Sequence, residues 1–151
     1  MNMFFKNLRT MWNRIPKTRY GKQAFLLGYD GKRAKILDIG CGNGSPASTK
    51  ELTRDCYYVG VDVGDYNQTS QSISMADEYH VFAPENFAEG IDGLPKDFDA
   101  VVSSHNLEHC NKPYETLRAM CRSLKRGAML HLSFPNSDSV NFPHRDGTLN
   151  F

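Results

Sequence analysis

The sequence predicts a doubly wound α/β fold in a single domain. Short strand-like runs alternate with segments of helical spacing, which favours right-handed βαβ units around a parallel sheet. The chain has 151 residues, 40% of them hydrophobic and 23% charged, and a chain of this length buries about two-thirds of its unfolded surface. A glycine-rich run directly follows the first strand-like segment, at the edge where parallel sheets bind ligands.

Apolar and β-branched runs predict the strands, which fall at residues 34–39, 57–61, 78–82, 98–103 and 128–134. Helical spacing predicts a basic amphipathic helix through residues 4–15 and a short helix over 22–27. Ser45-Pro46 reads as a helix start with Ser45 as the N-cap. A later helix through Leu117 and Leu124 is expected to stop at Gly127.

The formal net charge of +1 conceals an uneven distribution. Residues 1–35 hold nine Lys and Arg and one Asp, whereas the remainder holds nine basic and sixteen acidic residues. We expect the basic segment to dock on its own domain, and nucleic acid or a membrane surface is the less favoured partner. No run reaches the roughly 20 apolar residues of a membrane span, and no Cys-x-x-Cys pair occurs, so a cytoplasmic protein is expected.

The glycine-rich run Asp38-Ile39-Gly40-Cys41-Gly42-Asn43-Gly44 is the most informative segment. Glycines let backbone N–H groups approach a ligand at a helix start. The Gly-Lys-Ser/Thr of a phosphate-binding P-loop is missing, and the third glycine comes too early for a dinucleotide fingerprint. Asp38 at the strand end would repel a pyrophosphate, so a cofactor with a cationic end fits better.

Four segments together resemble the class I S-adenosylmethionine-dependent methyltransferases. They are the glycine-rich run, Gly60-Val61-Asp62, residues 98–103 with Leu107-Glu108-His109, and residues 124–128. The resemblance covers residues 34–136 and implies a Rossmann-like core between a basic helical segment, 1–33, and a substrate-side loop or tail, 137–151. It implies methyl transfer from S-adenosylmethionine to an oxygen or nitrogen of a small molecule. The alternative is a non-catalytic cofactor-binding or scaffold protein with a truncated methyltransferase-like core.

The resemblance also implies which residues hold the cofactor. Asp62 would accept hydrogen bonds from both ribose hydroxyls, and Asp38 would contact the cofactor amino group through water. The full expected set is Asp38, Gly40, Cys41, Gly42, Gly44, Asp62, Val63, Ser103 and Asn106. The family's acid after the third strand is not matched here. Its adenine-recognising role is left to Glu85 or Asn86, with Phe82 or Phe87 either stacking on adenine or packing in the core.

Two histidines after the fourth strand, His105 and His109, are the candidate general bases for an acceptor hydroxyl or amine. The His105-x-x-Glu108-His109 pattern resembles the Glu-x-x-Glu-His metal site of methyltransferases acting on small-RNA 3′ ends and on quinone-ring hydroxyls. That resemblance implies a divalent-metal site of His105, Glu108, His109 and His144. Imidazole at position 105 would shift its preference from Mg²⁺ toward Zn²⁺ or Ni²⁺. The competing interpretation is a segment that packs and hydrogen-bonds without metal.

Only 16 residues follow Pro135, too few for the helix and β-hairpin that usually end the family's sheet. The expected strand order is therefore 3-2-1-4-5 without the usual last two strands, which leaves the fifth strand at an edge. An unpaired edge tends to be covered or used for pairing. We expect either a homodimer or coverage by residues 137–151, which hold the candidate substrate-side residues His144, Arg145 and Asp146.

Overall fold

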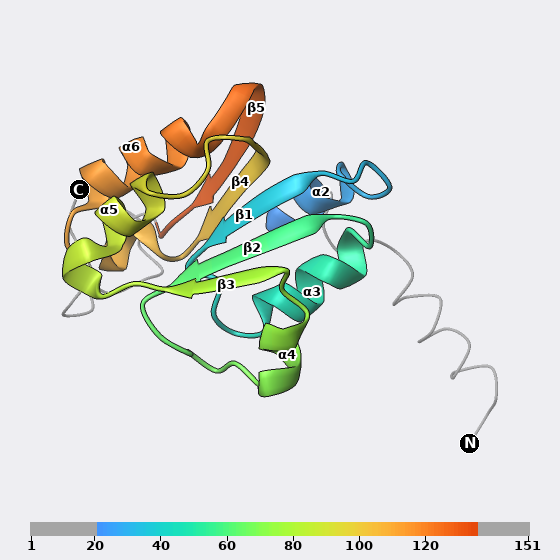
Figure 1. Ribbon diagram of the computed structural model, residues 1–151, viewed down its shortest axis with the longest axis horizontal. Coiled ribbons are helices and arrows are strands. Elements are labelled where there is room, and N and C mark those ends of the chain that lie inside the picture. Colours follow the sequence, from blue (N-terminus) through green and yellow to red (C-terminus); the bar gives the residue numbers. More distant parts are fainter. Residues whose placement is uncertain (1–20, 136–151) are drawn as a thin grey trace.

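A parallel sheet of five strands runs through the computed structural model, which describes residues 21–135 (Figure 1). The strands are β1 (Lys35–Ile39), β2 (Tyr57–Asp62), β3 (Glu78–Val81), β4 (Phe98–Ser104) and β5 (Leu124–Ser133). Their order is β3-β2-β1-β4-β5 with every neighbouring pair parallel, which confirms the predicted fold class and strand order. The order reverses between β1 and β4, so a ligand crevice is expected beyond the carboxyl ends of these strands.

Helices cover both faces of the sheet (Figure 1). One face carries α2 (Lys22–Leu27), α3 (Ser45–Leu52) and α4 (Ser70–Ser74), and the other carries α5 (Phe87–Asp92) and α6 (Pro113–Ser123). Single-turn 3₁₀ helices, η1 (Pro84–Asn86) and η2 (Leu107–His109), precede α5 and α6. Between residues 21 and 135, no helix is long and apolar enough to cross a membrane. The predicted helix through 4–15 and the candidate ligand His144 lie outside the described residues.

The central strands are buried on both sides, so their apolar residues alternate between two cores. Leu37, Ile39 and Val101 pack with Ile91 of α5 and Met120 of α6. On the opposite face the packed residues are Ile36, Tyr58, Ala100 and Val102, with Leu26 of α2. Fully burying a side chain of the size of Leu26 or Ile91 contributes about 1.5–3 kcal/mol. These contacts fix α2 and α5 against the sheet.

Two helix boundaries differ from the prediction. The N-cap of α3 is Gly44, in the left-handed conformation with φ 74°, and Ser45 is instead the first helical residue. The helix α6 ends at Ser123, because Leu124 is already extended with ψ 141° and enters β5 directly. Gly127, with φ 82°, lies inside β5, where the pairing with β4 shifts register.

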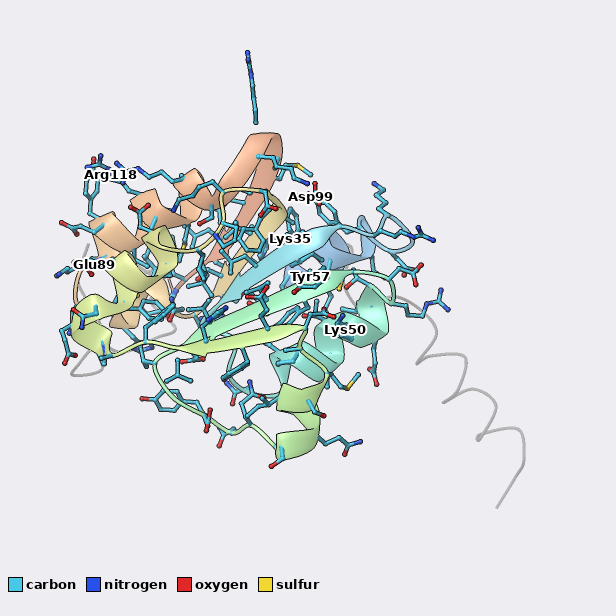
Figure 2. All side chains as sticks on the ribbon, in the orientation of Figure 1. Lys35, Lys50, Tyr57, Glu89, Asp99 and Arg118 are labelled. Atoms are coloured by element: carbon cyan, nitrogen blue, oxygen red, sulfur yellow. The ribbon has the colours of Figure 1, made fainter. Side chains whose placement is uncertain are left out.

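The amino-terminal end of the sheet is closed by charged and aromatic side chains, including the labelled Lys35, Tyr57 and Asp99 (Figure 2). Lys35 Nζ donates to Asp97 Oδ1 at 2.8 Å and lies 4.9 Å from the centroid of the Phe98 ring. The Asp99 carboxylate accepts from the Lys35 backbone N–H and from Lys125 Nζ, both at 2.8 Å. These contacts tie β1, β4 and β5 together at the end of the sheet away from the ligand crevice.

Candidate functional site

A cleft of about 800 Å³ opens at the carboxyl end of the sheet. Its volume falls within the roughly 300–1,000 Å³ that is usual for small-molecule and cofactor sites. The glycine loop after β1, the loop after β2, η1 with the start of α5, and the loop after β4 form its walls, and Lys22 of α2 joins them. The cleft therefore lies where the doubly wound topology predicts a ligand.

Gly40 of the loop leaves no room for a side chain, and Gly42 leaves little. A Cβ on Gly40, whose φ is +75°, would lie 2.5 Å from the Asn106 Cβ. A Cβ on Gly42 would lie 3.2 Å from the Tyr66 Cβ and 3.5 Å from Asp62 Oδ2. The loops after β2 and β4 thus pack directly on the glycine loop, and backbone at this point can approach a ligand closely.

Asp62 ends β2 with its carboxylate at the cleft wall, and the residue is only 5% exposed. Its Oδ1 accepts the backbone N–H of Val63 at 2.7 Å. Burial raises the pKa of Asp62 above its usual value, while the backbone N–H groups of Val63, Gly42 and Gly64 work against that rise. In its ionised form this carboxylate is an acceptor only, and its remaining lone pairs can accept hydrogen bonds from a ligand.

Asp38 lies at the end of β1, behind the cleft surface, and is 1% exposed. Lys22 Nζ donates to Asp38 Oδ2 at 2.7 Å and to Ser45 Oγ at 3.1 Å, and the Tyr58 hydroxyl donates to the same Oδ2 at 3.0 Å. Within residues 21–135, Asp38 Oδ1 has no hydrogen-bond partner. The cleft wall at this end therefore presents an ammonium group backed by a buried carboxylate.

The loop after β2 is hydrogen-bonded to the glycine loop at three points. The Asn43 N–H donates to the Tyr66 carbonyl at 2.8 Å, Asn67 Nδ2 donates to Asn43 Oδ1 at 2.8 Å, and Gln68 Nε2 donates to the Cys41 carbonyl at 2.6 Å. These three bonds, two of them from side-chain amides, hold the two loops at a fixed spacing.

Left-handed backbone is concentrated at this cleft. Among the described residues, four that are not glycine have positive φ, and three of them, Asn43, Asn67 and His105, line the cleft. Each such residue costs on the order of 1–3 kcal/mol and persists where its surroundings hold it. Backbone strain of this kind clusters at ligand sites, which supports a functional reading of the cleft.

The loop after β4 brings His105, Glu108 and His109 together. Glu108 is 4% exposed, and its Oε1 lies 3.7 Å from His105 Nδ1 and 3.9 Å from His109 Nε2. These separations are too long for hydrogen bonds. The predicted common helix face is not formed, because His105 precedes the single turn of η2. In the part of the chain that the structure describes, no three His, Cys, Asp or Glu side chains are arranged to hold a metal ion.

The predicted residues divide by their place in the cleft. Gly40, Gly42, Asp62, Val63 and Asn106 line it, as do the two candidate bases His105 and His109. Asp38, Cys41, Gly44 and Ser103 do not. Ser104 lines the cleft in place of Ser103, because successive strand residues face opposite sides. Burial raises the pKa of the Cys41 thiol to about 12, so this side chain stays protonated inside the core.

At the predicted adenine position, Pro84 and Phe87 line the cleft, while Glu85 and Asn86 are exposed beyond it. Phe82 does not line the cleft and stacks on the His80 ring, with a centroid distance of 5.8 Å. Sequence reasoning missed Lys22, Asn43, Tyr66 and Asn67, all of which line the cleft. Only Asn43 had a local signal, its place between two glycines of the loop.

Comparison with known proteins adds a family to this geometry. A family model described as "Methyltransferase domain" matches residues 14–149. The ubiquinone biosynthesis O-methyltransferase of Pseudomonas aeruginosa (strain LESB58) is 32% identical over 109 residues, which are 68% of this chain and 44% of that protein. The mitochondrial ubiquinone biosynthesis O-methyltransferase of Homo sapiens is 33% identical over 137 residues, 85% of this chain and 34% of that protein. The chain spans less than half the length of these curated relatives.

Solved structures share the fold. A SAM-dependent methyltransferase from Archaeoglobus fulgidus matches with a TM-score of 0.56 at 22% identity, over 80% of this chain and 57% of that chain. A TehB-like SAM-dependent methyltransferase from Corynebacterium glutamicum matches with a TM-score of 0.54 at 21% identity, over 83% of this chain and 69% of that chain. The family match, the strand order and the glycine loop agree, and the chain belongs to the class I S-adenosylmethionine-dependent methyltransferase family.

Proposed function

We propose that this chain binds S-adenosylmethionine in the cleft and transfers its methyl group to an oxygen atom of a small molecule. The observation that carries the proposal is the placement of Lys22 and Asp62 in the walls of one cleft, together with Gly40 and Gly42 of the glycine loop. The O-methyltransferase names of the relatives favour oxygen over nitrogen as the acceptor atom.

The residues present fit the two chemically different halves of this cofactor. Its amino-acid half is a zwitterion, and the Lys22 ammonium with the Asp38 carboxylate behind it offers one charge of each sign. Lys22 would pair with the cofactor carboxylate, and the free Asp38 Oδ1 would reach the amino group through water. Asp62 would accept hydrogen bonds from the two ribose hydroxyls. Gly40 and Gly42, which line the same cleft, would approach the cofactor with backbone alone.

When bound, S-adenosylmethionine supplies a methyl group already activated on a sulfonium sulfur. The protein then has to align the acceptor, keep water out and take up a proton. His105 and His109 line the cleft and have side chains that are 70% and 62% exposed, so either could accept the proton of an acceptor hydroxyl. Replacing the effective base with Ala is expected to lower kcat by about 10²- to 10⁴-fold and to leave cofactor affinity unchanged.

The divalent-metal site stays a prediction, and the steps above use no metal. Glu108 Oε1 lies 3.7 Å and 3.9 Å from one nitrogen of each imidazole, and Oε2 has no partner within residues 21–135, so the carboxylate could accept a further contact. Metal analysis of protein purified without a histidine tag, compared with His109→Ala, tests the site. Stoichiometric metal that is lost in the variant would support it, and no bound metal in either protein would remove it.

The proposed function is tested in two steps. Calorimetry with S-adenosylhomocysteine measures cofactor binding, and transfer of a labelled methyl group to pools of phenols, catechols and amines measures activity. Binding together with label on an oxygen acceptor is the expected result. Cofactor binding without transfer to any pool would favour the non-catalytic cofactor-binding alternative, and absence of binding would overturn the proposal.

A further inference from the structure

Tyr66 is a large aromatic side chain left open at the cleft wall. It lines the cleft and is 61% exposed. A single exposed aromatic residue is ordinary on a protein surface. Tyr114 on α6 is an example, with 68% exposure and Arg118 over its ring at 5.8 Å. Tyr66 differs because its backbone is fixed inside a ligand cleft.

Three contacts hold Tyr66 in place while leaving its ring free. Its carbonyl accepts the Asn43 N–H at 2.8 Å, and its Cβ lies 3.2 Å from the position a Cβ on Gly42 would take. The neighbouring Asn67, itself left-handed, is bonded to the Asn43 side chain. The ring has room because Gly64 carries no side chain, and Tyr66 Cε2 would be 3.7 Å from a Cβ there. The backbone and Cβ of Tyr66 therefore need no reordering when a ligand packs on its ring.

The position of the ring relative to Asp62 selects which half of a ligand it meets. The Tyr66 Cβ and Asp62 Oδ2 lie 3.2 Å and 3.5 Å from the position that a Cβ on Gly42 would take. Lys22 instead contacts Asp38 of β1 and Ser45, the first residue of α3. Phe87, the other large aromatic residue of the cleft, is only 3% exposed and belongs to the core. Tyr66 is therefore the aromatic ring that the nucleoside side of the cleft leaves uncovered.

We propose that Tyr66 packs its ring against the nucleoside half of the cofactor and so determines affinity for adenosine-containing ligands. This inference rests on the proposed function, because it assumes that Asp62 holds the ribose. A protein ring stacked on a base contributes the equivalent of about a 5- to 150-fold change in Kd when it is removed. The contribution should come from the ring and not from the hydroxyl.

Calorimetry on Tyr66→Ala tests the proposal with two ligands, S-adenosylhomocysteine and 5′-methylthioadenosine, which lacks the amino-acid half. Ala keeps the carbonyl and the Cβ that contact the glycine loop, so the loop should stay in place. We expect Kd to rise about 5- to 150-fold for both ligands. Tyr66→Phe should bind like the wild type, and Tyr114→Ala is the control for losing an exposed tyrosine outside the cleft.

The outcomes separate this inference from the proposed function. If the wild type binds both ligands and Tyr66→Ala binds them equally well, the Tyr66 assignment is overturned and the proposed function stands. A loss confined to S-adenosylhomocysteine would place the ring at the amino-acid half and would also overturn it. If the wild type binds neither ligand, both proposals fail.

Discussion

Asp62 combines burial with a place at the cleft wall, and one substitution tests its role. We expect Asp62→Ala to weaken S-adenosylhomocysteine binding by about 2–4 kcal/mol, because one hydrogen bond to a charged acceptor is worth about 1.5–3 kcal/mol and the effects of two bonds to one carboxylate are not additive. Calorimetry measures the change. The matched control is Asp97→Ala, which removes a carboxylate at the opposite end of the sheet that is 55% exposed. Equal affinities for the wild type and Asp62→Ala would remove the ribose assignment.

The raised pKa of Asp62 predicts a pH dependence of cofactor affinity. Ribose hydroxyls donate to the ionised carboxylate, so binding lowers the pKa from its raised value in the free protein. Affinity should therefore be complete above the free-protein pKa and fall as the pH drops through it, starting above the value of about 4 of an ordinary Asp. Calorimetric titrations between pH 7.5 and 4.5, with Asp62→Asn as the comparison, measure this. The same slope in Asp62→Asn would assign the effect to another group.

The packing around strand β2 requires a glycine at position 60. In the sequence, this glycine is noticeable only as part of the Gly60-Val61-Asp62 segment. A Cβ on Gly60 would lie 2.9 Å from Cys41 Sγ, 3.1 Å from the Tyr79 ring and 3.2 Å from the Tyr58 ring. Gly60→Ala should therefore lower the free energy of unfolding by about 1–3 kcal/mol in urea titrations. Adding Cys41→Ala removes the nearest atom and should recover part of the loss.

Gly93→Ala is the control for this pair, since Gly93 has φ −76° and its nearest neighbouring atom would lie 3.4 Å from the new Cβ. Strictly additive effects of Gly60→Ala and Cys41→Ala would show that the two sites do not interact, contrary to the packing described.

At the level of elements, the sequence predicts features that depend on neighbouring residues and misses those that depend on contacts between distant residues. The first four strands lie within one residue of their predicted positions, because buried strands in a parallel sheet are short apolar runs. The prediction for β5 was wrong at its start, because the strand begins at Leu124, four residues before the predicted apolar run. The prediction of Ser45 as the N-cap of α3 was wrong, because the left-handed turn that begins the helix falls one residue earlier, on Gly44. Lys22 could not be found, since its contact with Asp38 joins α2 to β1 and leaves no periodic pattern.

For the whole molecule, the outer edge of β5 is the feature that sequence reasoning expected to be covered. Within residues 21–135, β5 pairs with β4 alone, and Met129 is 56% exposed. Lys125, Arg126 and the irregular pairing near Gly127 protect the first half of the strand, whereas residues 128–134 contain no acid, lysine, arginine or proline. Charges, bulges and prolines are the usual protection of a sheet edge. The second half of β5 is thus suited to pairing with another strand.

We propose that a second copy of the chain pairs with this edge. Light scattering coupled to size-exclusion chromatography should then give the mass of a dimer, and Met129→Lys should shift the protein toward monomer by placing a charge on the edge. Ser74→Lys, in α4 and away from β5, is the control for added charge. A wild-type monomer at all concentrations would contradict the dimer and leave the edge to segments of the chain outside residues 21–135.

The helix α2 has a consequence for how such domains can be recombined. It precedes the first strand, yet its Leu26 is 1% exposed in the core and its Lys22 forms part of the ligand wall. A chimera that joined residues 34–135 to a foreign leader would keep the sheet and the glycine loop but would bury Asp38 without its counter-ion. Exchange of the catalytic core between methyltransferases should therefore succeed only when the upstream helix travels with it, or when the recipient supplies a cation at the same place.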